Sequence, residues 1–193
     1  MGSNARRRLR RKPTFVAVPV AAAAVVVAVT LPLLTDKRNE RKVEAGAPTP
    51  SLAGTAVRGG KVNLTRLRGH VVLLSFLDLR ADTAENGPSR AEIVFLRSMQ
   101  TQHARFGLRV VLVDTARQSR NDLVNDTYDW NLSPAIAVVG DDGTLARRVG
   151  VHQAPTTFVI GRNGVVRRRW DGFARAAQLD FAIRAAEGRS PTG

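Results

Sequence analysis

The chain has 193 residues, no cysteine, a hydrophobic fraction of 44% and a formal net charge of +14. This length and composition are typical of one globular domain with a tether. The lack of cysteine excludes disulfides, thiolate metal sites and any thiol nucleophile supplied by this chain.

The N-terminus predicts a membrane anchor. An uncharged stretch at 13–35 is dominated by valine, alanine and leucine, and about 20 apolar residues span a bilayer. Basic residues before it, against mixed charges after it, favour a cytoplasmic N-terminus. The residues before it are Arg6, Arg7, Arg8, Arg10, Arg11 and Lys12. We therefore expect a basic cytoplasmic tail at 1–12, a single transmembrane helix at 13–35 (or an uncleaved signal), and an extracytoplasmic domain.

Two alternatives remain for this N-terminus. Its charged start and apolar core also resemble a signal peptide, and Ala45-Gly46-Ala47 is a small-residue cleavage motif, so a secreted domain is the competing interpretation. The adjacent arginine pairs also fit a twin-arginine signal.

The next segment, 36–52, is charged and then rich in glycine, proline and alanine, which predicts a linker. We expect the folded domain at 53–188 and a short tail at 189–193.

The domain alternates strand and helix patterns. The sequence predicts strands at 71–77, 108–113 and 135–139, helices at 89–106, 119–130 and 178–186, and a helical turn at 142–149. A β-hairpin entered through Pro155 follows the turn, with a tight-turn signal at Asn163-Gly164. This order is typical of an α/β three-layer fold with parallel central strands and an antiparallel terminal hairpin.

Two serines carry helix-start signatures. Ser89 with Glu92, and Ser119 with Asp122, each form a capping-box pattern in which the serine accepts from the third residue of the helix. For Ser89 this structural role is preferred over a catalytic one.

The positive charge is divided along the chain. The first twelve residues carry +6 and the linker region about +1, which leaves +7 on the domain. The basic run Arg167-Arg168-Arg169 lies on the predicted last strand, where Arg168 should face opposite to its neighbours. We expect a solvated edge that discourages strand pairing, with contact to anionic lipid headgroups as the alternative. No nucleic-acid motif is present, so nucleic acid is not an expected partner.

The histidines predict neither a metal site nor a cofactor. His70, His103 and His152 lack ligand spacing with one another. His152, three residues before Pro155, is expected at the surface near the site discussed next.

Two motifs resemble the thioredoxin-like superfamily. Val151, Pro155, Thr156, Thr157 and Phe158 match its Val-x-x-x-Pro-Thr-Thr-Phe segment, in which a cis proline lies beside the redox dithiol. The segment at 60–76 resembles the entry of membrane-tethered thiol-disulfide oxidoreductases of the cytochrome c maturation type, and is similar to that of redoxins, their peroxiredoxin-like relatives. The resemblance implies a thioredoxin-like three-layer sandwich with a mixed central sheet.

The same resemblance implies where the dithiol would lie. In these families Cys-x-x-Cys is followed by Arg-x-Glu, and Arg90-Ala91-Glu92 therefore aligns Asn86-Gly87-Pro88-Ser89 with the dithiol. Asn86 and Ser89 are its vestigial positions, and 78–85 is an insertion with Thr83 at peroxiredoxin-like spacing. Disulfide exchange and thiol peroxidation both need a thiolate, so neither chemistry is available to this chain alone. A serine nucleophile would need a positioned base, which no spacing predicts.

We therefore expect a redox-inactive peptide-binding or scaffolding module. Its binding groove would hold an extended peptide between Asn86, Gly87, Pro88 and Ser89 on one side and Ala154, Pro155 and Thr156 on the other. The expected partners are membrane lipid, through the anchor, and an envelope protein or peptide in the groove. The alternatives are a redoxin-type oxidoreductase or antioxidant component that acts with a cysteine-bearing partner, and a drifted domain with a structural role.

Overall fold

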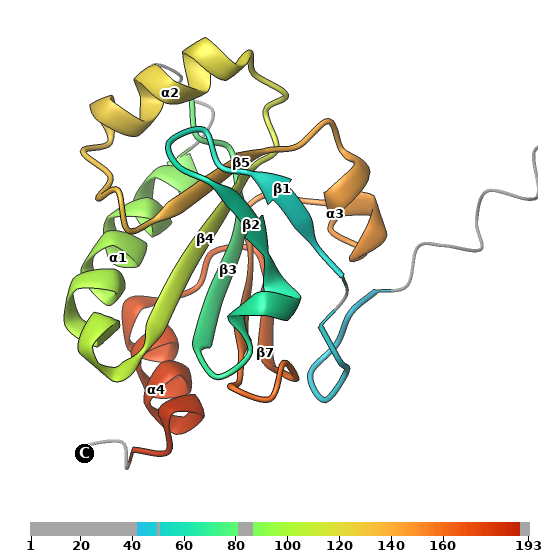
Figure 1. Cartoon of the computed structure of the whole chain (residues 1–193), viewed down its shortest axis with the longest axis vertical. Helices are drawn as coiled ribbons and strands as arrows, with labels where there is room; N and C mark the ends of the chain where they lie inside the picture. The colour runs from blue at the N-terminus through green and yellow to red at the C-terminus, as the bar shows by residue number, and fades with distance from the viewer. Residues whose placement is uncertain (1–41, 50, 81–86, 190–193) are drawn as a thin grey trace, which may run out of the picture. The chain divides into compact units, whose positions relative to one another are not determined.

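The computed structural model describes residues 42–49, 51–80 and 87–189 (Figure 1). The predicted cytoplasmic tail, the predicted anchor and Asn86 lie outside these ranges. No helix within the described ranges combines the length and hydropathy needed to cross a bilayer.

The elements follow the predicted alternation of strands and helices. The strands are β1 (Ala53–Thr55), β2 (Lys61–Asn63), β3 (Val71–Leu77), β4 (Leu108–Asp114), β5 (Ala137–Gly140), β6 (Thr156–Ile160) and β7 (Val166–Asp171). The helices are α1 (Gly87–His103), α2 (Arg120–Asp129), α3 (Thr144–Arg148) and α4 (Ala176–Glu187), and 3-10 helices span Leu64–Leu67 and Ala104–Phe106. β1 and β2 are not predicted from the sequence, because three residues are too few to show alternation.

The central sheet is mixed, as expected. Its order is β5-β4-β3-β6-β7, with β3, β4 and β5 parallel and the β6–β7 hairpin antiparallel to β3. β1 and β2 form a separate antiparallel pair. The parallel strands and the terminal hairpin therefore meet at β3, in the middle of the sheet.

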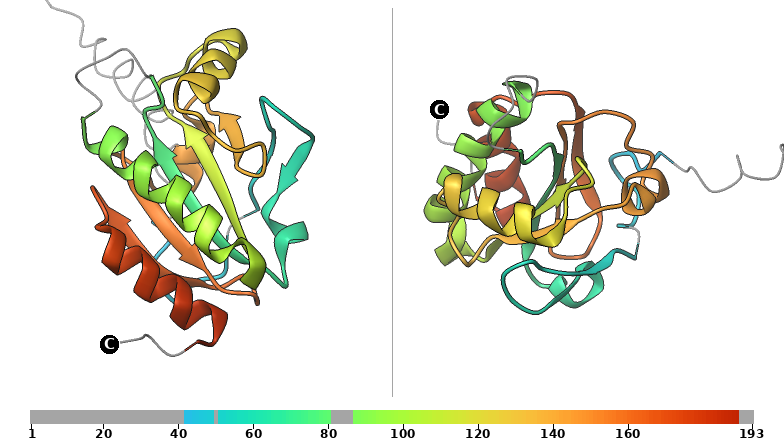
Figure 2. Two further views of the ribbon diagram at one scale, coloured as in Figure 1. Left: turned by 90° about the vertical axis from the view of Figure 1, so that its left-hand side faces the viewer. Right: turned by 90° about the horizontal axis from the view of Figure 1, so that it is seen from above.

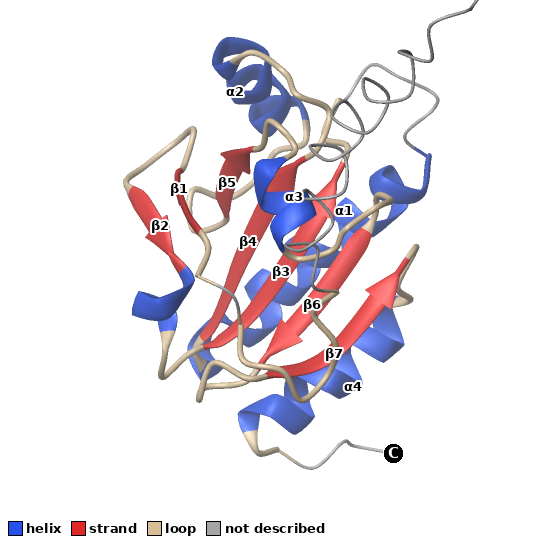
Figure 3. Cartoon of the chain, turned by 90° about the vertical axis from the view of Figure 1, so that its right-hand side faces the viewer, coloured by secondary structure: helices blue, strands red, loops and turns tan. Residues whose placement is uncertain are grey.

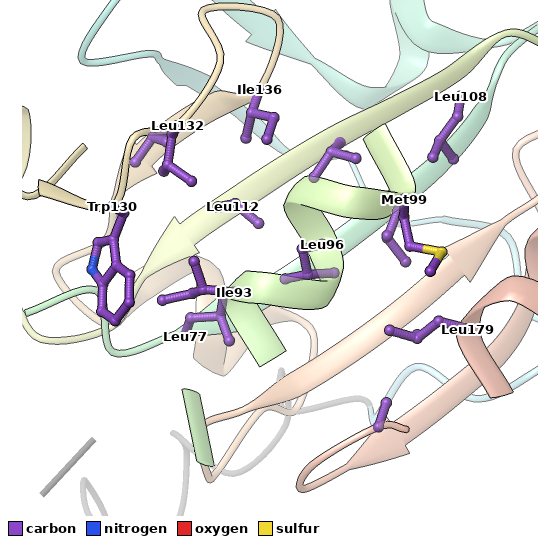
Figure 4. Packing of buried hydrophobic residues seen from close by; sticks show 14 of the residues in the cluster. Leu77, Ile93, Leu96, Met99, Leu108, Leu112, Trp130, Leu132, Ile136 and Leu179 are labelled. Atoms are coloured by element: carbon purple, nitrogen blue, oxygen red, sulfur yellow. The ribbon is translucent and has the colours of Figure 1, made fainter. Parts of the chain in front are cut away.

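One face of the sheet is covered by α1 and α4 (Figure 2). Every residue of β3 is buried because both of its faces are covered. Alternate residues of β3, including Leu73 and Leu77, face α1, which contributes Ile93, Leu96 and Met99 to the same cluster (Figure 4). Each fully buried side chain of this kind contributes about 1.5–3 kcal/mol, so α1 is firmly held against the sheet.

The opposite face carries α3 (Figure 3). Its cluster contains Phe76 from β3 and Phe158 from β6, whose rings meet edge to face at 6.1 Å between centroids. Alternate side chains of β3 therefore pack on opposite faces of the sheet, between it and the two outer layers of a three-layer sandwich.

The region expected as a linker differs from the prediction where the structure describes it. Val43 and Leu52 are buried in the α3-side cluster. The N–H of Gly46 donates to the carbonyl of Val166, and that of Thr49 to the carbonyl of Gly164, both at 2.8 Å. The packed domain therefore begins ahead of residue 53. The sequence does not predict this, because isolated apolar residues in a polar, proline-containing segment show no periodicity.

The arginine run on β7 also differs from the prediction. Arg168 pairs with Val159 and Arg169 with Phe158, which belong to opposite clusters, so these two arginines face opposite ways as expected. The expectation of a solvated edge is wrong for Arg169, whose side chain is only 3% exposed. Its guanidinium lies over the ring of Phe158 and donates to main-chain carbonyls outside the hairpin.

The second predicted helix start is confirmed. Ser119 is the N-cap of α2, and its hydroxyl accepts from the N–H of Asp122 at 3.2 Å.

Candidate functional site

The loop that enters β6 holds the matched proline motif. The peptide bond between Ala154 and Pro155 is cis, the isomer implied by the motif. Pro155 is buried and its carbonyl accepts from the N–H of Gly172 at 2.8 Å, while Thr156 donates its hydroxyl proton to the carbonyl of Gln153 at 2.7 Å. These contacts fix the loop on both sides of Ala154.

Ala154 itself is exposed. Within the described part of the chain, neither its N–H nor its C=O has a hydrogen-bond partner. A backbone donor and acceptor without partners, on an exposed residue two positions before β6, can pair with the backbone of another chain, as an added strand does.

Ser89 has a different role from the one predicted. α1 begins at Gly87, so Ser89 lies inside its first turn, and its side chain accepts from the N–H of Asp78 at 3.2 Å instead of from the helix backbone. The capping-box prediction is therefore wrong at this helix. Ser89 is 2% exposed, and none of the three histidines is hydrogen-bonded to it in the described ranges. Its hydroxyl thus joins the exit of β3 to α1 and has no histidine to act as a base.

Glu92, one turn after Ser89, is inaccessible to solvent. Its Oε1 accepts from the hydroxyls of Ser75, at 3.3 Å, and Thr157, and its Oε2 accepts from the N–H of Ala174 at 2.9 Å. Ser75 on β3 and Thr157 on β6 are register partners and also contact each other. The carboxyl group therefore ties α1 to two strands and to the segment before α4.

A proton count favours the neutral form of this carboxyl group. Ser75, Thr157 and Glu92 make three mutual oxygen–oxygen contacts, and the two hydroxyls carry only two protons. A protonated Glu92 supplies the third. Consistently, burial raises the pKa of Glu92 above its ordinary value, and the hydrogen bonds from Ala174, Thr157 and Ser75 offset only part of this.

A second buried carboxylate lies at the end of β4. Asp114 accepts from the N–H of Leu79 at 3.1 Å, and the carbonyl of Leu79 accepts from the indole of Trp130 at 2.8 Å. Burial raises the pKa of Asp114 despite these contacts. Asp114 thus holds the chain as it leaves β3 toward the position implied for the dithiol.

A cavity of about 310 Å³ lies beside Ala154. Its wall comes from three segments, namely the loop after β4, α3 with the turn before it, and the loop before Pro155. The polar side chains in this wall are Thr115, Arg117, Asp141, Arg147, His152 and Gln153. His152 is exposed, as predicted. The two arginines were not predicted, because they lie 30 residues apart in a chain rich in arginine.

The other histidines lie away from this cavity. His70 Nδ1 lies 3.2 Å from the carbonyl of Gly107. His103 is buried, with Nδ1 3.0 Å from Glu187 and Nε2 2.9 Å from Asp180. His103 therefore joins α1 to α4.

The expected groove is described only in part. Gly87 and Pro88 are exposed at the start of α1, and Ala154 is exposed in the proline loop, whereas Ser89, Pro155 and Thr156 are buried. Asn86 lies outside the described residues. The exposed members are therefore the ones available to a bound chain.

Comparisons with known proteins agree with the fold. A family model described as the AhpC/TSA family matches residues 45–169. The chain is 23% identical over 142 residues to the thiol-disulfide oxidoreductase ResA of Bacillus thuringiensis, an alignment that covers 74% of this chain and 78% of the relative.

Solved structures are similar as well. One described as a thiol:disulfide interchange protein, DsbE, from Chlorobium tepidum has a TM-score of 0.67 and 29% identity, over 76% of this chain and 100% of the other. A secreted thiol-disulfide isomerase from Corynebacterium glutamicum has a TM-score of 0.62 and 19% identity, over 73% and 86% of the two chains. The second likeness bears on the fold alone, which is thioredoxin-like.

Proposed function

Because this chain belongs to the AhpC/TSA family and yet has no cysteine, we propose that it is a redox-inactive member of that family which binds an extended peptide along Ala154. The observation that carries the proposal is that Ala154 is exposed and that its backbone N–H and C=O have no hydrogen-bond partner among the described residues, on a loop anchored by Pro155 and Thr156. Each backbone hydrogen bond to a bound strand adds a net stabilisation of about 0.5–1.5 kcal/mol. Such a module scaffolds a partner rather than transforming it.

We further propose that the domain is held outside the cytoplasm by the segment at 13–35. The support is the apolar length of that segment and the basic residues that precede it. Partners would then be envelope proteins or peptides.

The proposal is tested by photo-crosslinking in native membranes. A photoreactive amino acid is placed at His152, which is exposed beside Ala154, and for comparison at Ala185, which is exposed on α4. We expect a discrete crosslinked partner from position 152 and none from position 185.

The substitution Ala154→Pro removes the hydrogen bond proposed from the backbone N–H of residue 154 to the peptide, because proline has no backbone N–H to donate. With the crosslinker at position 152, this substitution should lower the crosslink yield several-fold while the circular dichroism spectrum is unchanged. An unchanged crosslink yield from a folded variant would contradict the proposal.

The identity of the captured partner separates the two candidate roles. A cysteine-containing redox protein would place this chain in a disulfide or peroxide pathway as a subunit without its own thiol, which is the alternative role. An envelope protein without redox chemistry would support the scaffold.

A further inference from the structure

Arg117 and Arg147, in the wall of the cavity beside Ala154, have no part in the peptide contact proposed above. We infer that they form a carboxylate-binding subsite that receives an acidic side chain of the peptide bound at Ala154. This inference rests on the proposed peptide-binding function and specifies the peptide as acidic.

Gly143 shows that the two guanidinium groups converge. A Cβ atom at Gly143 would lie 2.8 Å from an Nη atom of Arg117 and 2.9 Å from an Nη atom of Arg147. The arginines come from different segments, the loop after β4 and α3. One carboxylate placed between them can therefore accept hydrogen bonds from both, the strongest kind of pairing available to an arginine.

Within the described ranges, neither arginine forms an ion pair with a carboxylate. In the described ranges Arg117 has no hydrogen-bond or ion-pair partner. Arg147 donates only to the hydroxyl of Thr144, at 3.4 Å, and makes a minor contribution to the lowered pKa of Asp142, to which hydrogen bonds from Thr144 contribute most.

Asp141 also lies in the wall, but its carboxylate is already engaged. Its two oxygens accept from the N–H groups of Leu145 and Ala146, each at 2.9 Å. Asp141 is buried, and both of its oxygens are held by backbone N–H groups at the start of α3.

The backbone of Arg117 is a second, independent observation. Its φ is +57°, in the left-handed region that side chains other than glycine and asparagine rarely adopt. Such conformations cost about 1–3 kcal/mol and cluster at ligand sites. Here the conformation belongs to a residue that lines the cavity and whose guanidinium group has no partner in the described ranges.

The subsite and Ala154 share one cavity, because Ala154 lines the same wall as the two arginines. The cavity includes Ala154 in its lining and has buried apolar side chains, Val151 and Ala146, in its wall. A volume of about 310 Å³ exceeds that of an aspartate or glutamate side chain. Residues along an extended strand advance by about 3.3 Å, so moving the acidic residue along the peptide locates the position that meets the arginines.

The test uses the full chain in lipid nanodiscs and fluorescein-labelled decapeptides of alanine and threonine. One set carries a single glutamate at each position in turn, and the matched set carries glutamine there. Fluorescence anisotropy should show the best glutamate peptide binding on the order of tenfold more tightly than its glutamine counterpart, a preference that weakens with added salt.

The variant Arg117→Gln/Arg147→Gln should abolish the glutamate preference and leave the affinity for the glutamine peptides unchanged. The matched control is Arg148→Gln/Arg168→Gln, which removes the same charge from two exposed arginines that do not line the cavity. The control should keep the preference. A preference lost equally in both variants would mean general charge attraction and would overturn the subsite.

A second measurement separates the subsite from the peptide site. Free glutarate is titrated into the isotope-labelled chain while the amide resonance of Gly143 is followed by NMR. Equal binding of glutamate and glutamine peptides, with no shift at Gly143, would overturn the subsite and leave the peptide function standing. A glutarate shift that the double variant abolishes, without binding of any peptide, would retain the carboxylate pocket but overturn both its peptide occupant and the proposed function.

Discussion

At the residue scale, Glu92 is a buried carboxyl group held by hydrogen bonds from three segments. Its carboxyl group contacts β3, β6 and the segment before α4, and no solvent reaches it. A buried polar group is tolerated only when its hydrogen bonds are made, which for Glu92 includes its own proton. In a chain without thiols, this network is best explained as a structural one.

Glu92 makes folding stability pH-dependent in a defined direction. The pKa of Glu92 is raised in the folded state. Its contribution to folding stability is therefore fully present below the unfolded pKa of about 4.3 and is lost as the pH rises through the folded pKa. Between those two values the free energy of unfolding should fall by about 1.4 kcal/mol per pH unit from this group. Urea unfolding of the native chain and of Glu92→Gln at several pH values measures the effect.

Comparing the native chain with Glu92→Gln isolates the pH dependence that Glu92 contributes, because the other titrating groups are common to both chains. A glutamine at this position can donate to Ser75 and Thr157 and accept from Ala174 without a titrating proton. The stability difference between the two chains should therefore change with pH in favour of the variant. A difference that stays constant from pH 4 upward would show that Glu92 does not titrate as proposed.

At the element scale, β7 is the last strand of the sheet and also anchors the segment around Val43. Nη1 of Arg169 donates to the carbonyls of Val43 and Val149, and Nη2 donates to that of Gly150 at 2.7 Å. The planar guanidinium carries five N–H donors in a fixed fork, so it can serve several acceptors on different segments at once. One side chain thereby holds the N-terminal segment, the end of α3 and the edge of the sheet together.

Removing this guanidinium should destabilise the fold. Arg169→Met would remove one donor from each of three main-chain carbonyls and the ion-pair partner of Asp171, at a cost of about 3 kcal/mol. Arg168→Met, one residue away on an exposed side chain, should change stability by less than about 0.5 kcal/mol. Chemical denaturation of both variants measures the contrast, and equal effects would contradict the anchoring role.

At the scale of the whole molecule, the chain combines a thioredoxin-like domain with a predicted anchor. In the proposed arrangement the exposed surface around Ala154 would face the extracytoplasmic space, and the basic residues ahead of the anchor would remain inside. Under this proposal the charge of +6 on residues 1–12 would set the membrane orientation, and a charge of about +7 would remain on the domain.

Reporter fusions test this orientation. Alkaline phosphatase, active only outside the cytoplasm, should be active when joined after residue 193 in a bacterial host, and a fluorescent protein joined at the same place should be dark. The mass of the purified chain then separates an anchor, which retains 1–35, from a cleaved signal. An active cytoplasmic reporter at the C-terminus would contradict the topology.

Local patterns in the chain determined much of the architecture. The alternation of strands and helices, the cap at Ser119 and the turn at Asn163-Gly164 depend on residues only a few positions apart, so the sequence alone predicts them. Composition likewise excluded thiol chemistry, whatever the fold. The proline motif predicted where β6 begins and that Ala154 lies beside the site.

The roles of Ser89, Glu92 and Arg169 were decided only by the tertiary structure. From neighbouring residues alone, the sequence predicts that Glu92 caps a helix and that Arg169 lies on a solvated edge. In the fold their partners lie as far as 82 and 126 positions away, respectively. Burial and charge pairing are properties of the space around a side chain, and that space is filled by distant segments, so no local pattern determines them.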